Sequence, residues 1–551
     1  DHVNTEPYLR ASAWRDASSH PPILRNGAEL AACLPVDMVG KPFYAASMTS
    51  YSIFDLDAVQ TRAMWSHSVS DCLSIFNDRK ECVAMATGLS AGFFEPGMLE
   101  YRRAGRHTYC VRWKQSTSTP TSPSSALFVG QGPTARMRPA QSIVSESAEK
   151  PLVVMLACTQ AKESLQPLPV LQFMVMLVQV TASSGQLVWM LTQNTQASNG
   201  LLVQPEHAGA WTWARAVRAE VSKCSLLSVD LVMGPHDATP HLKSVEPETV
   251  LSAAATLVPR LGNCRMSEGK RSQSNQIEKD HASIHLVTGG TGALGLVTSR
   301  WLANLTNSHV FVGSRTGSMP TEFSASVSGL QLNTMVCNVA EAADVQRFAT
   351  CINREEPFHF GVWHAAGVLA DAVLVRQDTQ MLRSVFAPKA HGARLLHMSL
   401  ARVPLEPCFL FSAGAALLGA AGQTNYCAAN GFLDALASAR QAGGTSAVSV
   451  QWGPWAEVGM ATDARVSSRM TSLGIAPIPI AYGVSVLQHA LNHPTVSVVA
   501  MIVMQWAKWQ QAGRDGAYFE EVTRQTHPST FAETSAVQLV PAIEMGAGKI
   551  S

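Results

Sequence analysis

The amino-acid sequence predicts an α/β protein in which two units of alternating strands and helices follow one another along the chain. Apolar strand-like runs alternate with helical patterns on both sides of a polar stretch at residues 262–281, and such alternation is typical of parallel sheets. Hydrophobic residues make up 46% of the chain and charged residues 15%, so a large buried core can form. A length of 551 residues corresponds to about three or four compact units.

The first unit follows a stretch rich in Ser, Thr and Pro at residues 115–150, which indicates a loop or linker. Its apolar runs predict strands, and one amphipathic segment predicts a helix. The predicted strands are Val153–Cys158, Val170–Val180, Leu187–Thr192 and Leu226–Leu231, and the predicted helix is Ala208–Val221. The longest apolar run, Leu168 to Val180, is too short to span a bilayer and is interpreted as a core strand.

The second unit repeats this alternation more strongly, from a strand at Ile284–Thr288 to one at Ala447–Trp452. Scattered charge and few periodic segments after about residue 510 indicate a loosely ordered tail. The chain begins with Asp1 and not with Met, which favours a fragment or a processed piece and leaves the cellular address open.

Charge and cysteine content exclude several classes of protein. Lys and Arg number 41 against 40 Asp and Glu, a net charge of +1, so no global field attracts nucleic acid or an anionic membrane. The eleven cysteines are scattered and contain no CxxC pair, which argues against a disulfide framework and against a zinc site. We therefore expect no metal and a reducing, cytoplasmic compartment.

The sharpest local motif is HLVTGGTGALGLVTSRWLA at residues 285–303, where an apolar strand runs into a glycine-rich turn and then a helix. Gly290, Gly292 and Gly295 have the GxGxxG spacing. In a dinucleotide site such glycines allow a tight turn, close approach of the backbone to a pyrophosphate, and close packing of helix on strand. The alternative is a glycine-rich strand–helix turn without a ligand.

A basic residue follows the next predicted strand and bears on the choice of dinucleotide. That strand, His309–Gly313, ends in Ser314 and Arg315, and Arg315 lies 20 residues beyond Gly295. An acidic residue near this place would bind the ribose 2′-hydroxyl of NAD, whereas an Arg suits the 2′-phosphate of NADP. The alternative is a solvated Arg at a strand end. The sequence favours NADPH.

Further motifs identify a family resemblance. TGGTGALG, VGSRTG, HAAGV (364–368), GQTNYCAANGFLDALA (422–437) and VQWGPWAEVGMA (450–461) closely resemble the ketoreductase domain of modular polyketide synthases and related fatty acid synthases. These are extended short-chain dehydrogenases/reductases. Upstream, YCVRW (109–113), GAWTWARAVRAEV, SVDL (228–231) and VPRL (258–261) resemble the family's non-catalytic structural half. The resemblance implies two tandem Rossmann-like, doubly wound subdomains, structural at 107–275 and catalytic at 282–510, with a linker or tail at 511–551.

The resemblance also implies the catalytic residues. Tyr426 matches the family's tyrosine, Asn430 lies four residues later, and Lys389 lies in FAPKAHGARLLH, which matches the family's lysine motif. A phenol is a poor acid at pH 7 unless a nearby cation stabilises its phenolate. Lys389 would do this and hold the nicotinamide ribose, Tyr426 would protonate the ketone oxygen, and Asn430 would position the lysine or a relay water. The alternatives are a core Tyr, a surface Lys and a helix Asn.

One departure from the family bears on activity. The family's catalytic serine lies 13 residues before the tyrosine, and that position is Ala413 in this chain. Ser412 lies one residue earlier and remains a catalytic candidate, although neighbouring strand side chains face opposite sides unless a bulge rotates one. Losing one donor to a developing oxyanion costs about 10² to 10³ in rate. Thr424, Asn425 or a water are the possible substitutes.

The resemblance carries over a wider set of binding residues. For the cofactor these are Thr288, Gly290, Thr291, Gly292, Leu294, Gly295, Ser314, Arg315, Asn338, Val339, Ala365, Ala366 and Gly367; for substrate and stereocontrol they are Leu369, Asp371, Gln423, Trp452, Pro454 and Trp455. The family usually has Asp where this chain has Asn338, so we expect weaker adenine binding at most. Asp371 retains the last residue of the Leu-Asp-Asp motif of B-type enzymes, which form the D-alcohol, whereas the other class has Trp where this chain has Leu418.

The first hundred residues resemble the second hotdog fold of a polyketide dehydratase. HPPIL (20–24), LPVDM and residues 66–91 carry the resemblance, but Arg25 and Glu29 occupy the places of the family's catalytic Asp and its polar partner. Residues 1–106 are therefore interpreted as a non-catalytic, α+β hotdog-like segment; the alternative is an unrelated α+β cap.

Together these observations predict an NADPH-dependent reductase that converts a carrier-bound β-ketoacyl thioester to its β-hydroxyacyl form within a polyketide synthase. The chain has no condensing, acyltransferase or carrier motif, so an acyl carrier protein and other synthase domains are the expected partners, without nucleic acid or membrane. The main alternative is a silent, cofactor-binding scaffold that lacks the catalytic serine. A free-standing short-chain reductase is a third interpretation, in which the structural half has no purpose.

Overall fold

The computed structural model describes most of the chain after residue 103 and six short strands before it. The described residues are 43–47, 50–53, 64–69, 72–77, 82–87, 90–93, 104–116, 127–130, 152–155, 167–181, 187–198, 203–221, 224–232, 246–252, 255–264, 283–305, 308–320, 331–352, 359–401, 403, 405–456, 464–492, 496–514 and 516–524. None of the helices among them is both long enough and apolar enough to cross a membrane.

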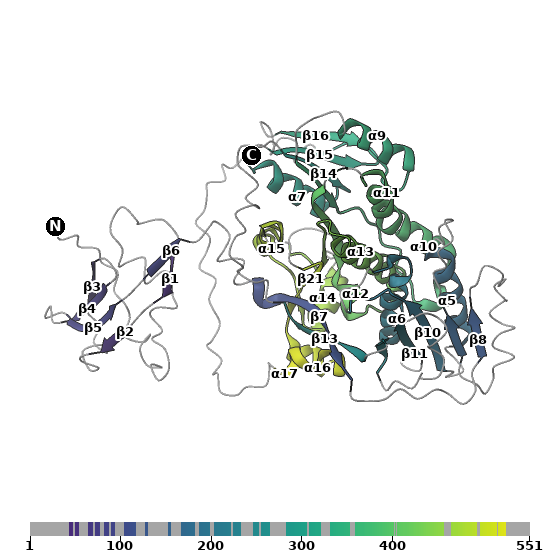
Figure 1. The fold of residues 1–551 in the computed structure, drawn as a ribbon, viewed down its shortest axis with the longest axis horizontal. Helices are drawn as coiled ribbons and strands as arrows, with labels where there is room; N and C mark the ends of the chain where they lie inside the picture. Colours follow the sequence, from purple (N-terminus) through teal and green to yellow (C-terminus); the bar gives the residue numbers. More distant parts are fainter. Residues whose placement is uncertain are drawn as a thin grey trace.

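A single 14-stranded sheet runs through both predicted subdomains (Figure 1). The half predicted to be catalytic, called the catalytic half below, contains β16 (Leu332–Val336), β15 (Ser308–Ser314), β14 (Ser283–Thr288), β17 (His359–His364), β18 (Leu405–Ala413), β19 (Val448–Trp452) and β21 (Val498–Met501), in that spatial order. Neighbouring strands of this half are parallel. The first six stand in the order 3-2-1-4-5-6 when numbered along the chain, which is the Rossmann order. The predicted fold class is confirmed here.

The structural half continues the same sheet. It contains β7 (Thr108–Gln115), β13 (Thr256–Asn263), β12 (Glu248–Leu251), β11 (Ser225–Leu231), β10 (Leu187–Gln193), β9 (Leu152–Met155) and β8 (Leu127–Gly130). Strands β8 to β12 are parallel, and β13 and β7 return antiparallel. The halves join where β7 pairs antiparallel with β21, with Tyr109 opposite Ala500. Backbone hydrogen bonds therefore connect the two subdomains directly.

Helices cover both faces of the sheet. They are α5 (Pro167–Thr181), α6 (Ala208–Glu220), α7 (Ala293–Ala303), α9 (Ala342–Ile352), α10 (Thr379–Phe386), α11 (Gly392–Ser399), α12 (Gly414–Leu418), α13 (Thr424–Ala442), α14 (Ala464–Ser472), α15 (Ile480–Asn492), α16 (Trp506–Gln511) and α17 (Glu520–Arg524). Short turns are η4 (Gly105–His107), η5 (Pro205–His207), η7 (Leu374–Arg376), η8 (Ala387–His391) and η9 (Ala517–Phe519), and two short strands, β20 (Ile475–Ala476) and β22 (Val503–Met504), pair with each other.

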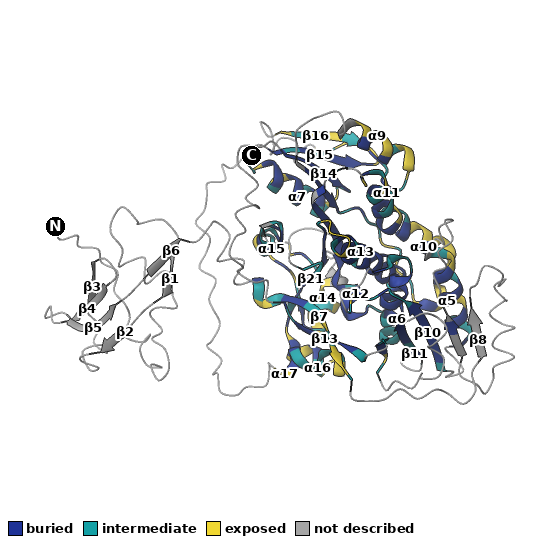
Figure 2. Cartoon of the chain, in the orientation of Figure 1, coloured by how far each residue is buried: buried dark blue, intermediate teal, exposed yellow. Residues whose placement is uncertain are grey.

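Helix α13 is the centre of the molecule and is almost wholly buried (Figure 2). It packs against α6 of the structural half, and a side chain at Gly209 or Gly431 would collide with the facing helix. The Thr212 hydroxyl donates to the Cys427 carbonyl across this contact (2.7 Å). Because α13 carries Tyr426, the structural half fixes the position of the candidate catalytic helix.

The prediction of a strand at Val170–Val180 is wrong, because these residues form helix α5. Val170, Leu171, Phe173, Met174, Val175, Leu177 and Val178 are all buried, and Met176 is the exposed apolar residue of the segment. A helix buried on nearly every side has no polar face, so its sequence lacks a 3.6-residue period and resembles a buried strand. Its length favours the helix, since core strands are usually shorter.

Two terminal segments also bear on the predictions. Residues 517–524, assigned to the tail, form η9 and α17, and α17 places Glu521 beside Arg112 of β7, an ion pair of 3.7 Å.

In the first hundred residues, strands β1 (Phe43–Ser47) and β6 (Ser90–Phe93) pair, as do β2 (Ser50–Ile53), β5 (Cys82–Thr87), β4 (Cys72–Asn77) and β3 (Met64–Val69), all antiparallel. HPPIL, Arg25 and Glu29 lie outside the described residues, so the hotdog-like segment stays a prediction.

Candidate active site

The glycine-rich turn between β14 and α7 has the geometry of an anion-binding loop. A Cβ at Gly290 would meet Val312 Cγ1 at 2.5 Å, and one at Gly295 would collide with the backbone of Gly289 and Gly290. Packing of strand on helix thus requires glycine at both positions. At Gly292 a Cβ would meet only the Gly289 carbonyl, at 3.1 Å, so this face is open for a ligand.

The start of α7 leaves donors for such a ligand. Gly292 is the N-cap residue and offers no side-chain cap, and the first intrahelical bond runs from Leu296 N to Gly292 O (2.9 Å). The amides of the first turn therefore point outward at the positive end of the helix dipole, where phosphate binds. Leu294 lies in this turn and Thr291 directly precedes the N-cap residue.

The remaining cofactor candidates lie along the ends of the neighbouring strands. Ser314 is buried at the end of β15 and its hydroxyl accepts from Gly317 N (3.0 Å), whereas Arg315 is exposed. Asn338 follows β16, and its side-chain oxygen accepts from Ala340 N (3.3 Å) in a local turn. The other candidates in this region are Thr288, Val339, Ala365, Ala366 and Gly367, at or beyond the ends of β14, β16 and β17.

Lys389, Asn430 and Tyr426 form one buried cluster at the end of β18. Lys389 Nζ donates to Asn430 Oδ1 and to the carbonyl of Phe411, each at 2.8 Å. It lies 5.0 Å from the centroid of the Tyr426 ring, and Asn430 Nδ2 donates to the Tyr426 carbonyl (2.8 Å). The structure thus brings together three residues that the sequence separates by up to 41 positions.

Lys389 reaches this place through an irregular helix. It lies in η8, a π-helical turn between α10 and α11, and such turns are frequent at functional sites. His364 Nε2 lies 3.0 Å from the Lys389 carbonyl, and its Nδ1 lies 2.7 Å from the Thr288 hydroxyl. Burial lowers the pKa of His364 to about 4, so this imidazole is neutral and acts as a fixed bridge from β14 to the lysine.

Burial sets the proton affinities in the cluster. It lowers the pKa of Lys389 to about 7, against an opposing effect of the Asp434 carboxylate. It raises the pKa of Tyr426 to about 12, with hydrogen bonding by Asn430 opposing part of the shift. Tyr426 is therefore a protonated phenol at neutral pH, ready to act as an acid, while Lys389 gains or loses its charge near neutrality.

Ala413 leaves a gap in this arrangement. It is the last residue of β18, lines the cavity and pairs in register with Trp452. The hydroxyl of Ser412 is directed to α13, where it donates to the Asn430 carbonyl (3.4 Å). Asn425 is bonded to Ala370 O and to Tyr426 N, and neither it nor Thr424 lines the cavity. Ser412 thus lines the cavity while its hydroxyl bonds to the backbone of α13.

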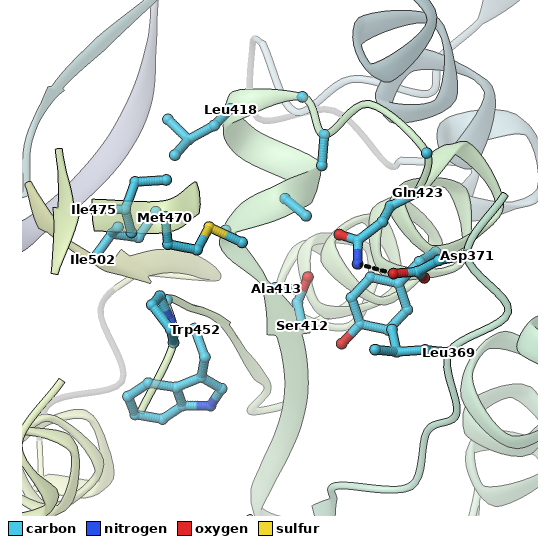
Figure 3. A pocket seen from close by; sticks show the side chains of 18 of the residues that line it. Leu369, Asp371, Ser412, Ala413, Leu418, Gln423, Trp452, Met470, Ile475 and Ile502 are labelled. Carbon is cyan, nitrogen blue, oxygen red and sulfur yellow. Dashed lines mark hydrogen bonds between the residues drawn. The ribbon is translucent and has the colours of Figure 1, made fainter. Parts of the chain in front are cut away.

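A cavity of about 430 Å³ opens at this end of the sheet. Figure 3 shows Asp371, Gln423 and Leu369 on one side of Ser412 and Ala413, and Leu418, Met470, Ile475 and Ile502 on the other. Gln423 Nε2 donates to Asp371 Oδ2 (2.8 Å), which fixes both side chains at the cavity wall. Trp452, Pro454 and Trp455 also line it. All six predicted substrate residues therefore share one cavity with Tyr426.

Sequence reasoning missed a carboxylate that fastens the substrate loops. Glu220, at the end of α6, accepts from Leu374 N (2.5 Å) and from Gly422 N (2.8 Å). Gln179 of α5 donates to the carbonyls of Leu374 and Gln377, at 2.8 and 3.0 Å. The structural half thereby holds the two loops that carry Asp371 and Gln423. No local signal marks Glu220, because its partners lie more than 150 residues away.

Asp434 is the second residue that sequence reasoning missed. This half-buried carboxylate on α13 accepts from the Ser449 hydroxyl (2.6 Å) and from Gln451 Nε2 (2.7 Å). It is the carboxylate whose charge favours the protonated form of Lys389. Its position four residues after Asn430, one helical turn further along the same face, was the available signal.

Comparison with known proteins agrees with this Rossmann-type arrangement. Residues 283–457 match the family model described as the KR domain. Polyketide synthase GfsE of Streptomyces halstedii is 34% identical over 291 residues, which are 52% of this chain and 8% of that protein. The chain thus spans a small part of the curated relatives it matches.

Solved structures show the same fold. An A1-type ketoreductase superposes with a TM-score of 0.67 at 24% identity, over 76% of this chain and 98% of that one. The first ketoreductase of the tylosin polyketide synthase gives a TM-score of 0.63 at 23% identity, over 77% and 99%. Residues 283–457 thus resemble the KR domains of polyketide synthases, and the wider chain shares the fold of the solved ketoreductases.

Proposed function

We propose that this protein is the NADPH-dependent β-ketoacyl reductase of a polyketide synthase, acting on a thioester carried by an acyl carrier protein. The observation that carries the proposal is the buried Lys389–Asn430–Tyr426 cluster, whose Lys389 and Tyr426 line the same cavity as Leu294 at the start of α7. A phenol acid and a neighbouring cation beside a dinucleotide loop are the groups that carbonyl reduction needs.

The residues fit NADPH as the cofactor. The open face at Gly292 and the uncapped start of α7 suit a pyrophosphate, and the exposed Arg315 suits a 2′-phosphate. Asn338 would lie beside the adenine. Bound NADPH supplies the hydride that reduces the ketone carbon.

The chain's own groups supply the proton and the electrostatics. Tyr426 donates its Oη proton to the ketone oxygen, and Lys389 stabilises the phenolate that remains. Asn430 holds Lys389 in place through its 2.8 Å contact. Trp452, Pro454 and Trp455 exclude water from the cavity wall. Asp371, held by Gln423, orients the ketone so that the D-configured alcohol forms, as in B-type enzymes.

The acyl carrier protein and the other synthase domains are the proposed partners. The relatives are many times longer than this chain, which supports a part in a larger assembly. We also propose a cytoplasmic location, since Cys110, Cys224, Cys264, Cys337, Cys408 and Cys427 are all free thiols and free thiols persist in reducing compartments.

The direct test measures NADPH oxidation with a β-ketoacyl pantetheine thioester. We expect turnover that Tyr426→Phe abolishes, because the phenylalanine cannot donate the proton. Tyr482→Phe is the matched control, since Tyr482 does not line the cavity, and it should retain the parent rate. Turnover that survives Tyr426→Phe would contradict the proposal.

A second candidate function is a cofactor-binding scaffold without turnover. Ala413 favours it, because alanine has no hydroxyl to donate and the hydroxyl of the neighbouring Ser412 bonds to the backbone of α13. Both candidate functions predict binding of NADPH, so only turnover distinguishes between them. Binding of NADPH with no turnover in the parent protein would favour the scaffold.

A further inference from the structure

Two arginines that the proposed chemistry does not use line the substrate cavity. Arg469 lies on α14 and Arg514 follows α16, and both border the cavity that contains Tyr426. The wall also includes the apolar side chains of Met470, Leu473 and Ile502. The cavity therefore combines reactive polar groups, an apolar wall and two cations.

The two guanidinium groups lack an anionic counterpart in the part of the chain that the structure describes. Neither is in an ion pair there, whereas Arg524 nearby is paired with Glu520. Arg514 is half-buried and packs over the ring of Trp509, 5.3 Å from its centroid. Burial lowers the pKa of Arg514, and the charge of Arg469 lowers it further. Two cations that repel each other beside a cavity are stabilised by a bound anion.

We infer that Arg469 and Arg514 form a binding site for the phosphate of the phosphopantetheine arm that delivers the substrate. This inference rests on the proposed function. When the ketone lies at Tyr426, the thioester and its arm must leave through the same cavity, and the arm carries its anion at the end remote from the sulfur. The apolar wall suits the dimethyl group of the arm, and the planar guanidinium binds phosphate by paired hydrogen bonds.

The test compares equilibrium binding of phosphopantetheine and of pantetheine, which lacks the phosphate, by titration calorimetry on the full chain. We expect phosphopantetheine to bind about tenfold more tightly, the size of one charge-assisted contact. Arg514→Gln and Arg469→Gln should each reduce this advantage, and the double variant should remove it. Raising the ionic strength should also reduce it. Arg524→Gln is the matched control, since it lies outside the cavity, and should keep the advantage.

Several outcomes would overturn the inference. Equal affinity for the two ligands, binding of neither, or an advantage that survives the double variant would each do so. So would a tenfold gain from a carboxylate placed at the end of the acyl chain of a pantetheine thioester, because the anion would then come from the acyl group. Turnover of the thioester is measured separately. Tighter binding of phosphopantetheine without turnover would contradict the proposed reductase activity but support the phosphate site. Turnover without tighter binding of phosphopantetheine would contradict the phosphate site alone.

Discussion

Restoring a hydroxyl at position 413 is the sharpest perturbation that the structure offers. Ala413 ends β18, is 8% exposed and belongs to the same buried cluster as Tyr426. Its backbone is extended (φ −138°, ψ 144°) and it is the N-cap residue of α12, without a side-chain cap. Serine is compatible with this backbone and is among the favoured N-cap residues, so Ala413→Ser should fold as the parent does.

The size of the expected gain in kcat follows from the burial of position 413. A hydroxyl at this buried position can donate to the ketone oxygen as negative charge develops there. One such donor is worth about 10² to 10³ in kcat, and we expect a gain of that size in Ala413→Ser. The serine can cap α12 and still donate to the ketone, because the cap uses the hydroxyl oxygen as an acceptor and leaves the O–H group free to donate. The cap should itself add about 1 kcal/mol to the free energy of unfolding.

The assay is steady-state oxidation of NADPH with a β-ketoacyl N-acetylcysteamine thioester, which yields kcat and KM separately. Three variants accompany the parent: Ala413→Ser, its combination with Tyr426→Phe, and Ala401→Ser as an exposed control outside the cavity. The combined variant should be inactive, since the serine positions charge but does not supply the proton. The control should match the parent.

A folded Ala413→Ser protein that binds NADPH normally but keeps the parent's kcat would refute the reasoning. It would mean that another donor already serves the ketone oxygen, or that the cavity holds the substrate elsewhere. Activity that appears only in Ala413→Ser would show an intact but silenced site, and the scaffold function would then describe the natural chain.

Three further predictions concern charge and contact. Because kcat/KM reports the free enzyme and the pKa of Lys389 is about 7, kcat/KM should fall as pH rises through about 7 and the lysine loses its charge. Asp434→Asn should move this fall to lower pH, and an unchanged pH profile would contradict the role of that carboxylate. Glu220→Gln should raise KM and lower the free energy of unfolding by about 1 to 2 kcal/mol, since one of the two hydrogen bonds from backbone amides to this side chain is lost. A urea titration measures the free energy of unfolding, and a variant with unaltered KM and stability would contradict this prediction. Arg315→Ala should raise KM for NADPH about tenfold and leave KM for NADH unchanged, whereas equal effects on both would exclude contact with the 2′-phosphate.

Local patterns were sufficient for three strands of the catalytic half and for one helix of the structural half. The strands predicted at Ile284–Thr288, His309–Gly313 and Ala447–Trp452 are β14, β15 and β19, because each is a short apolar run bounded by turn residues. Helix α6 was predicted at Ala208–Val221 for a similar reason, since its sequence carries a helical period. The glycine spacing marked the turn after β14 because packing and backbone geometry at Gly290 and Gly295 admit no side chain.

Where burial removed the pattern, local reasoning failed. Helix α5 was interpreted as a strand because apolar residues cover nearly its whole circumference, which leaves no polar face to reveal the period. Strand β8 lies within the Ser/Thr/Pro-rich stretch that was interpreted as a loop or linker, and α17 lies within the predicted tail. In each case packing against distant elements, rather than local propensity, decides the element.

Local motifs in the sequence identify the groups that are available for chemistry: a glycine-rich turn, an arginine after the next strand, a tyrosine and a lysine in recognisable motifs, and an alanine in the place of the family's serine. How these groups are arranged is set by the tertiary structure. It brought Lys389 to Asn430 and the Phe411 carbonyl, placed Asp434 within its field, and used Glu220 of the other half to hold the substrate loops. The physical reason is that a motif can be recognised from residues adjacent in the chain. Burial, proton affinity and loop position instead depend on contacts between residues that lie from 22 to 202 positions apart.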